Sequence, residues 1–71
     1  MDELKLHDVV ALTRAIPESN LRRGEIGVVI DIGPNGLYLL EFADRNGVTY
    51  AMPAVSIEGL MKVYLHADMV E

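Results

Sequence analysis

The fold of this chain is decided by one stretch of sequence, Leu21-Arg22-Arg23-Gly24-Glu25-Ile26-Gly27-Val28-Val29-Ile30-Asp31-Ile32. It opens with a turn, because the glycine after the two arginines accepts backbone angles that cost other residues free energy. It continues as a strand, because β-branched residues recur at every second position, the pattern of a strand with one buried face. The predicted inner face consists of Ile26, Val28, Ile30 and Ile32, and the predicted outer face of Glu25, Gly27, Val29 and Asp31.

Gly27 lies inside this strand, where a residue without a side chain weakens the packing. Glycine occurs at such positions where a strand bends sharply or where two backbones approach closely, as at the corner of a small barrel. We therefore predict that residues 26–32 form a strongly bent strand of a small closed sheet. The alternative is that a ligand approaches the backbone at Gly27.

Two predicted elements precede this strand. Residues 8–13 alternate in the same way and form the first strand. Residues 14–21 form a long loop, because they contain a proline, which lacks an amide donor, and a serine–asparagine pair, which favours a turn. Ile16 and Leu21 are apolar residues within this loop, and we expect them to anchor it to the sheet.

Three predicted strands follow the central one. Gly33-Pro34-Asn35-Gly36 and Asn46-Gly47 are strong turn signals, so antiparallel hairpins are expected there. Pro53 is expected to end the strand that precedes it, because it cannot donate a hydrogen bond to a neighbouring strand. The remaining predicted elements are strands at 37–42 and 48–52, one 3₁₀ turn within 55–59, and a last strand at 60–64.

Five short antiparallel strands, a long first loop and a 3₁₀ turn before the last strand describe an SH3-like barrel. We therefore predict an all-β protein with a single domain over residues 1–71. The barrel core is expected at about 6–64 and a C-terminal tail at 65–71. In the lead-in, Leu4 or Leu6 is expected to pack against the sheet.

Five segments carry a resemblance to a known family: Asp8-Val9-Val10-Ala11-Leu12-Thr13, Ile16-Pro17-Glu18, residues 21–29, Tyr38-Leu39-Leu40-Glu41-Phe42 and residues 47–51. Together they resemble the small bacterial DUF4926 proteins over roughly residues 6–64. The resemblance implies an SH3-like barrel, similar in shape to the SH3-like subunit of the photosynthetic NADH-dehydrogenase-like complex that docks ferredoxin. It implies no activity, because the function of the family is unknown. The chain departs from the pattern at Met52-Pro53-Ala54-Val55.

The composition restricts the classes of partner. The chain of 71 residues has no cysteine, which excludes disulfides and cysteine-based zinc sites. Its formal net charge of −5 repels phosphate backbones, so no nucleic-acid partner is expected despite Arg14, Arg22 and Arg23. We see neither the pattern of a signal peptide nor an apolar run approaching the roughly 20 residues of a transmembrane helix. We therefore expect a cytoplasmic bacterial protein without a membrane partner.

No pattern in the sequence predicts catalysis, a cofactor or a metal. The two histidines, His7 and His66, would meet Asp8 and Asp68 only if the ends of the chain came together. Solvated histidines are the expected alternative. No serine or threonine lies in a recognisable nucleophile turn, and the carboxylates on the strands are predicted to face water. We expect neither enzymatic activity nor a bound cofactor.

Binding to another protein is the class of function that remains. The predicted inward residues of the third strand are Tyr38, Leu40 and Phe42. Leu37 and Leu39 are then expected on its outer face, beside Val29 of the neighbouring strand. Exposing such a cluster costs about 25 cal/mol per Å² of apolar surface, which favours a covering partner. The predicted interaction surface consists of Val29, Leu37, Leu39, Asp31 and Glu41.

Two functions are compatible with this surface. One is a non-enzymatic protein–protein interaction module, a small accessory subunit of a larger complex or a homodimer. In that case the apolar patch is covered by a partner, by a second copy, or by the tail at 65–70. The other is an acidic antitoxin or immunity-type protein, in which Asp31, Glu41 and Asp44 mask a basic toxin.

Overall fold

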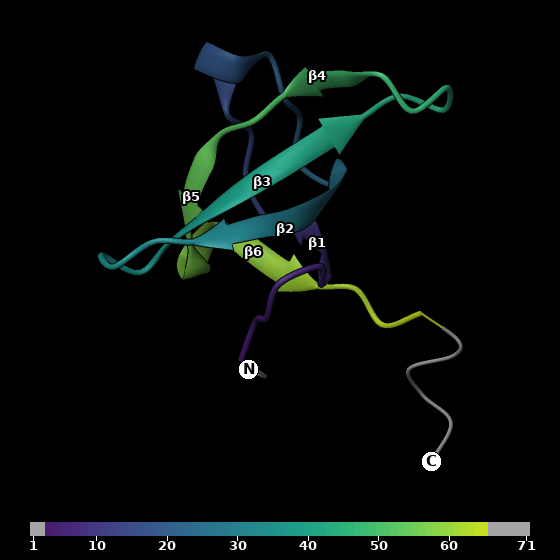
Figure 1. The fold of residues 1–71 in the computed structure, drawn as a ribbon. Helices are drawn as coiled ribbons and strands as arrows, with labels where there is room; N and C mark the ends of the chain where they lie inside the picture. The colour runs from purple at the N-terminus through teal and green to yellow at the C-terminus, as the bar shows by residue number, and fades with distance from the viewer. Residues whose placement is uncertain (1–2, 66–71) are drawn as a thin grey trace.

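The structure, a computed structural model, describes residues 3–65. These residues form an all-β domain of six strands and two 3₁₀ turns, with no α-helix among them. In chain order the elements are β1 (Val9–Leu12), the 3₁₀ turn η1 (Pro17–Ser19), β2 (Ile26–Ile32), β3 (Leu37–Ala43), β4 (Thr49–Ala51), β5 (Ala54–Ser56), the 3₁₀ turn η2 (Ile57–Gly59) and β6 (Leu60–Lys62) (Figure 1).

The strands form one antiparallel sheet in the order β4-β3-β2-β1-β6, and β5 pairs with β3 as well. The predicted hairpins are confirmed, and at the second of them Gly47 has a φ of 81°. Within residues 3–65 no strand pairing joins β6 to β4 or β5, so the sheet is open. The structure has six strands, one more than the five predicted. Because the sheet is open, closure into a barrel stays a prediction.

The additional strand, β5, follows from Pro53. The predicted strand at 48–52 ends at Ala51, before the proline, as β4. The chain then stays beside β3, because the Pro53 carbonyl accepts a hydrogen bond from the Leu40 N–H at 2.9 Å. β5 continues this pairing over the next three residues. The predicted 3₁₀ turn starts only afterwards, at Ile57.

The two faces of β2 are opposite to the prediction over its first half. Gly27 and Val29 are buried, whereas Ile26 is 51% exposed. Gly27 pairs with Val10 of β1, and Val29 pairs with Leu40 of β3. Directly paired residues project to the same side of a sheet, and both partners are core residues. The predicted alternation is present, but in this part of β2 the residues predicted to face outward are the ones that face the core.

A β-bulge limits this error to one part of the strand. Val29 pairs with Leu40 and Asp31 with Leu39, so Ile30 is an extra residue on β2. An extra residue shifts the alternation of sides beyond it. Ile32, the last residue of β2, therefore pairs with Tyr38, which packs against the core. Ile32 itself is 42% exposed, so its predicted inward position is not confirmed.

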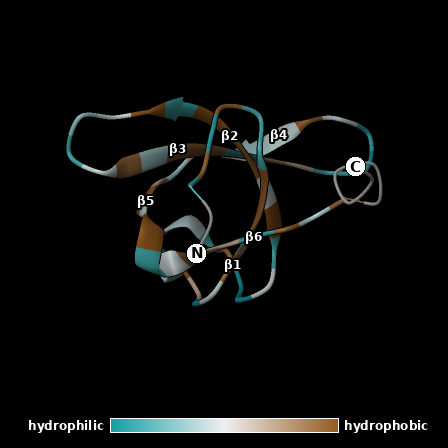
Figure 2. Ribbon diagram, turned by 90° about the horizontal axis from the view of Figure 1, so that it is seen from below, coloured by the Kyte–Doolittle hydropathy of each residue, from teal (hydrophilic) through white to brown (hydrophobic). Residues whose placement is uncertain are grey.

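The sheet is curved, and its strands wrap around the core, which lies on the inner side of the curve (Figures 1 and 2). The lead-in contributes Leu4, which is 2% exposed, whereas Leu6 is 51% exposed. The long loop is anchored as predicted, because Leu21 is buried and bridges to Ile16. The buried core residues are Leu4, Val10, Leu12, Leu21, Val29, Leu40, Phe42 and Leu60.

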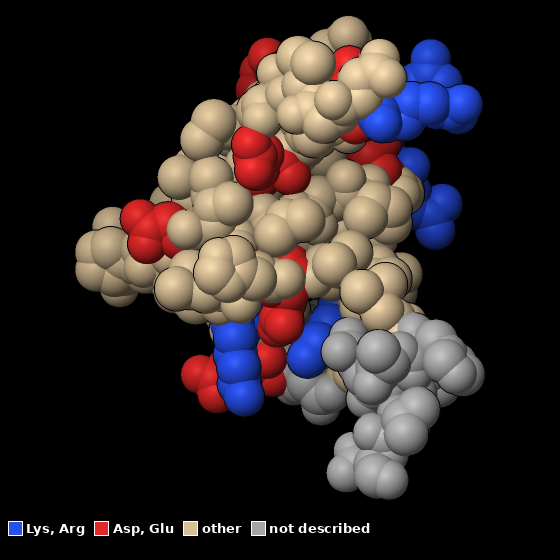
Figure 3. Space-filling view, turned by 45° about the vertical axis from the view of Figure 1, so that its right-hand side comes forward, with Lys and Arg blue, Asp and Glu red and all other residues tan. Residues whose placement is uncertain are grey.

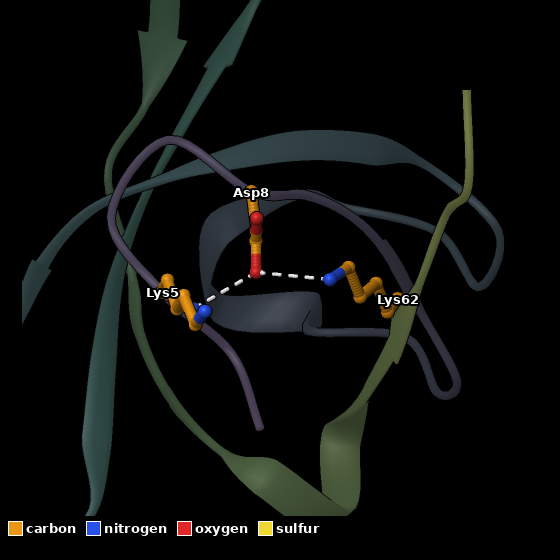
Figure 4. A network of polar contacts seen from close by, with 3 residues as sticks. All are labelled: Lys5, Asp8 and Lys62. Atoms are coloured by element: carbon orange, nitrogen blue, oxygen red, sulfur yellow. Dashed lines mark hydrogen bonds and ion pairs between the residues drawn. The ribbon is translucent and has the colours of Figure 1, made fainter. Parts of the chain in front are cut away.

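Asp8 fastens the lead-in to the sheet (Figure 4). Its carboxylate accepts a hydrogen bond from the Lys5 N–H at 2.8 Å and lies 3.6 Å from the Lys62 ammonium group of β6. Next to it, the His7 N–H donates to the Val29 carbonyl at 2.7 Å. These contacts hold the turn before β1 against both β2 and β6, which keeps Leu4 in the core.

The close approach predicted at Gly27 is confirmed. A Cβ atom built on Gly27 would lie 2.9 Å from Cε2 and Cζ of Phe42 and 3.1 Å from the Glu41 carbonyl oxygen. The ring of Phe42 thus occupies the space that a side chain would need. This contact of β2 with β3 is the reason for glycine at this position.

Candidate functional site

The structure removes one residue, Val29, from the predicted interaction surface, whereas Asp31 and Leu39 of that surface are direct partners across β2 and β3. Val29 has an exposed fraction of 0%, so its predicted outer position is wrong. Leu37 is 40% exposed at the start of β3. Leu39 and Glu41 are half-buried, and Asp31 is exposed. These residues do not form one continuous patch with Val29, and only Leu37 borders a groove.

The two carboxylates of that surface are held by contacts within the chain. The Asp31 carboxylate accepts a hydrogen bond from the Ile32 N–H at 2.8 Å. The Glu41 carboxylate accepts one from the Thr49 hydroxyl. Acidic groups are spread among uncharged atoms over the face in Figure 3, whereas basic groups lie near the edges of that view. On this face the acidic groups are thus dispersed.

The groove beside Leu37 has a volume of about 310 Å³ and is open to solvent. One wall is formed by residues 14–16 and 18 of the loop after β1. The other wall is formed by Leu37, by β5 and by Gly59 of η2. We call this feature the β5 groove. Its volume lies at the lower end of the range of about 300–1,000 Å³ for small-molecule sites.

The first wall is held in place by the connection of the loop to η2. The Thr13 N–H donates to the Gly59 carbonyl at 2.9 Å, and the Thr13 hydroxyl donates to the Glu58 carbonyl at 3.0 Å. A Cβ atom on Gly59 would lie 2.9 Å from Cγ1 of Val55 and 3.8 Å from Nε of Arg14. The Arg14 side chain therefore lies over η2, close to the floor of the groove.

The second wall offers backbone groups of an edge strand. The hydrogen bond from Leu40 to Pro53 marks these residues as a hydrogen-bonded pair. Such pairs alternate along an antiparallel ladder, so Tyr38 and Val55 form the next one. The N–H groups of β5 on either side of Val55, those of Ala54 and Ser56, then point away from β3. Both residues line the groove.

Three charged residues determine the electrostatics of the groove. Arg14 and Glu18 lie on the loop wall. Glu58 lies beside Gly59, and a hydrogen bond from the Ser56 hydroxyl lowers the pKa of its carboxyl, with smaller lowering effects from its own backbone N–H and from Arg14. Glu58 therefore stays ionised at neutral pH. The lining of the groove thus carries one base, Arg14, and one acid, Glu18, and Glu58 lies next to the lining residue Gly59.

This arrangement is suited to binding an extended chain. It combines apolar surface, edge-strand N–H groups and fixed charges.

The serine of the groove, Ser56, bonds through its hydroxyl to Glu58. Residues 3–65 contain no cluster of three or more histidine, cysteine or acidic side chains that would hold a metal ion. His7 is exposed, whereas His66 and Asp68 of the predicted metal alternative lie outside the described residues.

A contact away from the groove joins β4 to the start of β2. The Tyr50 hydroxyl donates to the Glu25 carboxylate at 2.8 Å, and the Arg22 N–H donates to the same carboxylate at 2.6 Å. The bond from the Arg22 backbone, followed by that from Tyr50, lowers the pKa of Glu25, and the bond to Glu25 raises the pKa of Tyr50. This exposed contact fastens the short strand β4 across the sheet.

The chain was compared with known proteins. A family model described as a domain of unknown function, DUF4926, matches residues 6–62. The chain belongs to the DUF4926 family. The match confirms the resemblance predicted from the sequence and includes both walls of the β5 groove. No curated protein and no solved structure was found to be similar to this DUF4926 chain.

The sequence of the DUF4926 domain gave little indication of the groove. The apolar residues of the loop and Leu37 were recognised, but Arg14 and Glu18 were not assigned to a site. The one local signal was Pro53, since a proline after a short strand indicates an edge. Among residues 3–65 no helix has the length and apolar character needed to cross a membrane.

Proposed function

We propose that this DUF4926 chain is a non-enzymatic protein–protein interaction module, and that it holds an extended segment of its partner in the β5 groove. On this proposal it is a small accessory subunit of a larger complex in the bacterial cytoplasm. The observation that carries the proposal is the register of β5 against β3, which directs the Ala54 and Ser56 N–H groups away from β3, together with the position of both residues in the lining of the groove. An extended peptide pairs with such an edge through its main chain, while its alternate side chains provide specificity.

The chemistry of the groove indicates what the segment contains. Ile16, Leu37 and Val55 offer apolar surface for one side chain of the partner. Glu18 and Glu58 favour a basic residue next to it, and the net charge of −5 attracts a basic partner over longer distances. We therefore expect an extended segment in which an apolar residue lies next to a lysine or arginine.

We also infer that the sheet curves into an SH3-like barrel. The long first loop, the strand order and the 3₁₀ turn before β6 support this inference. The Tyr50–Glu25 hydrogen bond draws β4 towards the start of β2, and the bonds of Thr13 draw η2 towards the end of β1. Side-chain and loop contacts then close the barrel where the strand ladder is open.

An acidic protein that masks a basic toxin is the second candidate. The excess of 11 acidic over 6 basic residues favours it. In that case binding depends on the dispersed carboxylates of Asp31, Glu41 and Asp44 rather than on the groove. Substituting Asp31 and Asp44 by lysine would then abolish binding, whereas the interaction module loses its partner through changes in the groove.

Capture of the partner from the native bacterial lysate tests the proposed function. We expect Leu37→Lys, at a 40% exposed position, to remain folded and to lose at least about nine-tenths of the captured partner, because a single buried anchor can be worth 2 kcal/mol or more. The matched control is Val48→Lys, a 60% exposed position in the turn before β4, which should retain the partner. Equal capture by Leu37→Lys and wild type would contradict binding in the groove.

A further inference from the structure

A second surface, independent of the β5 groove, lies on the outer side of β1. Val10 and Leu12 of β1 point into the core, so Val9 and Ala11 point to the opposite side of the sheet. Ala11 pairs with residues of both neighbouring strands, and Val9 pairs with one of β2. We define the β1 face by five apolar side chains on this side of β1, β2 and β6, which are Val9, Ala11, Ile26, Val28 and Met61.

The β1 face is apolar throughout and partly exposed. Ile26 is 51% and Met61 is 55% exposed, and they flank Ala11 in register on the two neighbouring strands. Val9 and Val28, the next pair along the sheet, are half-buried. Most of the β2 ribbon is brown in Figure 2, in keeping with its apolar residues on both sides. Such a face on a soluble domain marks a contact surface.

We propose that two copies of this chain associate through their β1 faces. The shape of the face favours a second copy, because the small Ala11, which is only 5% exposed, lies between the exposed side chains of Ile26 and Met61. A twofold rotation can place Ile26 or Met61 of one copy opposite the small Ala11 of the other. The face is therefore complementary to itself.

The charges at the border of the β1 face are complementary to themselves as well. Glu41 of β3 pairs with Val28 and lies at one border. Arg23 lies near Met61 of β6, on the other side of the face from β3, because both residues line one pocket. A twofold axis in the plane of the interface that exchanges these borders brings Glu41 of each copy opposite Arg23 of the other. The dimer then contains two symmetric ion pairs.

A stable dimer must bury more area than the β1 face alone provides, so the borders that carry Glu41 and Arg23 are part of the interface. A specific interface at the low end of the usual size buries about 600 Å² on each copy, about an eighth of the 5147 Å² surface of the chain. Five residues on three strands do not supply this area alone, so the contact extends to β3 and to the turn before β2. The β5 groove shares no residue with this face and stays accessible in the dimer.

Sedimentation of the full chain from micromolar to millimolar concentration tests the proposal. We expect wild type to dimerise and Met61→Glu to be a folded monomer by circular dichroism. Ile26→Lys serves as the second variant should Met61→Glu not fold. Glu41→Arg and Arg23→Glu should each weaken self-association on the order of tenfold or more, because each creates like-charged pairs. An equimolar mixture of these two variants should form heterodimers, since one ion pair is then restored with reversed sign and the other keeps its original sign.

The control is Val48→Glu, which lies outside the β1 face and should dimerise like wild type. A wild-type chain that stays monomeric would overturn the proposal and leave the β1 face to a different occupant. A dimer that is lost in Val48→Glu but retained in Met61→Glu would place the interface elsewhere. Two weakened charge variants that do not associate when mixed would contradict the twofold arrangement.

Discussion

Replacing Gly27 by valine is expected to destabilise the domain by about 1–3 kcal/mol, the usual cost of forcing extra methyl groups into a packed core. The Cβ atom alone would lie 2.9 Å from the ring of Phe42, and the backbone of Glu41 at 3.1 Å leaves no second direction for relief. Domains of this size rarely exceed 3–5 kcal/mol of stability, so the variant should be largely unfolded at moderate urea concentration. Urea denaturation followed by circular dichroism measures the change.

A matched control is Gly33→Ala. Gly33 has no positive φ, and a Cβ atom there would lie 3.4 Å from the Leu37 carbonyl oxygen, an ordinary contact. We expect a much smaller change than for Gly27→Val. Phe42→Leu should recover part of the stability of Gly27→Val, because it removes the ring atoms that collide. Equal stability of wild type and Gly27→Val would show that β2 and β3 are not packed as closely as described.

Val29→Asp is expected to unfold the domain, whereas Val28→Asp is expected to fold. Val29 is 0% exposed and packs in the core, so an aspartate there is buried without a partner. Burying an unpaired charge belongs to the small group of substitutions that cost more than about 4 kcal/mol. Val28 is half-buried on the opposite side of the sheet, where a carboxylate reaches water.

Thermal denaturation of the two valine variants shows directly whether Val28 or Val29 faces the core. The sequence pattern alone predicted Val28 inside and Val29 outside, so it predicts the reverse order of stability. A folded Val29→Asp together with an unfolded Val28→Asp would restore that earlier assignment. Because Val28 belongs to the β1 face, the folded Val28→Asp variant should also be monomeric.

The strands were predictable because their signals are local. The turns before β3 and β4 contain residues that favour positive φ, and the apolar alternation on either side marks the strands. Which of the two alternating sets of β2 residues faces the core was not predictable, because both sets contain apolar residues between Ile26 and Ile30. The choice depends on Gly27, whose missing side chain makes room for Phe42, and on a bulge that leaves no sequence signal of its own.

The candidate sites were less predictable than the strands, because tertiary contacts create them. Leu37 was assigned to an interaction surface from alternation, and it does line the β5 groove. Its neighbours Arg14 and Glu18 lie about twenty residues away along the chain and reach it only because Thr13 binds η2. The sequence interval after Pro53 was expected to enter a turn directly, so the edge strand β5 was missed.

The most direct test of the interaction module is an amide chemical-shift titration of the isotope-labelled full chain with the protein captured from the lysate. We predict that the largest shifts occur along both walls of the β5 groove, at residues 14–18 and 54–59, and that the turn at 44–48 stays unchanged. Ala54 and Ser56 N–H groups should also gain protection from hydrogen exchange, because they would pair with the strand of the partner. Shifts confined to Asp31, Glu41 and Asp44, with both walls of the groove unaffected, would contradict binding in the groove.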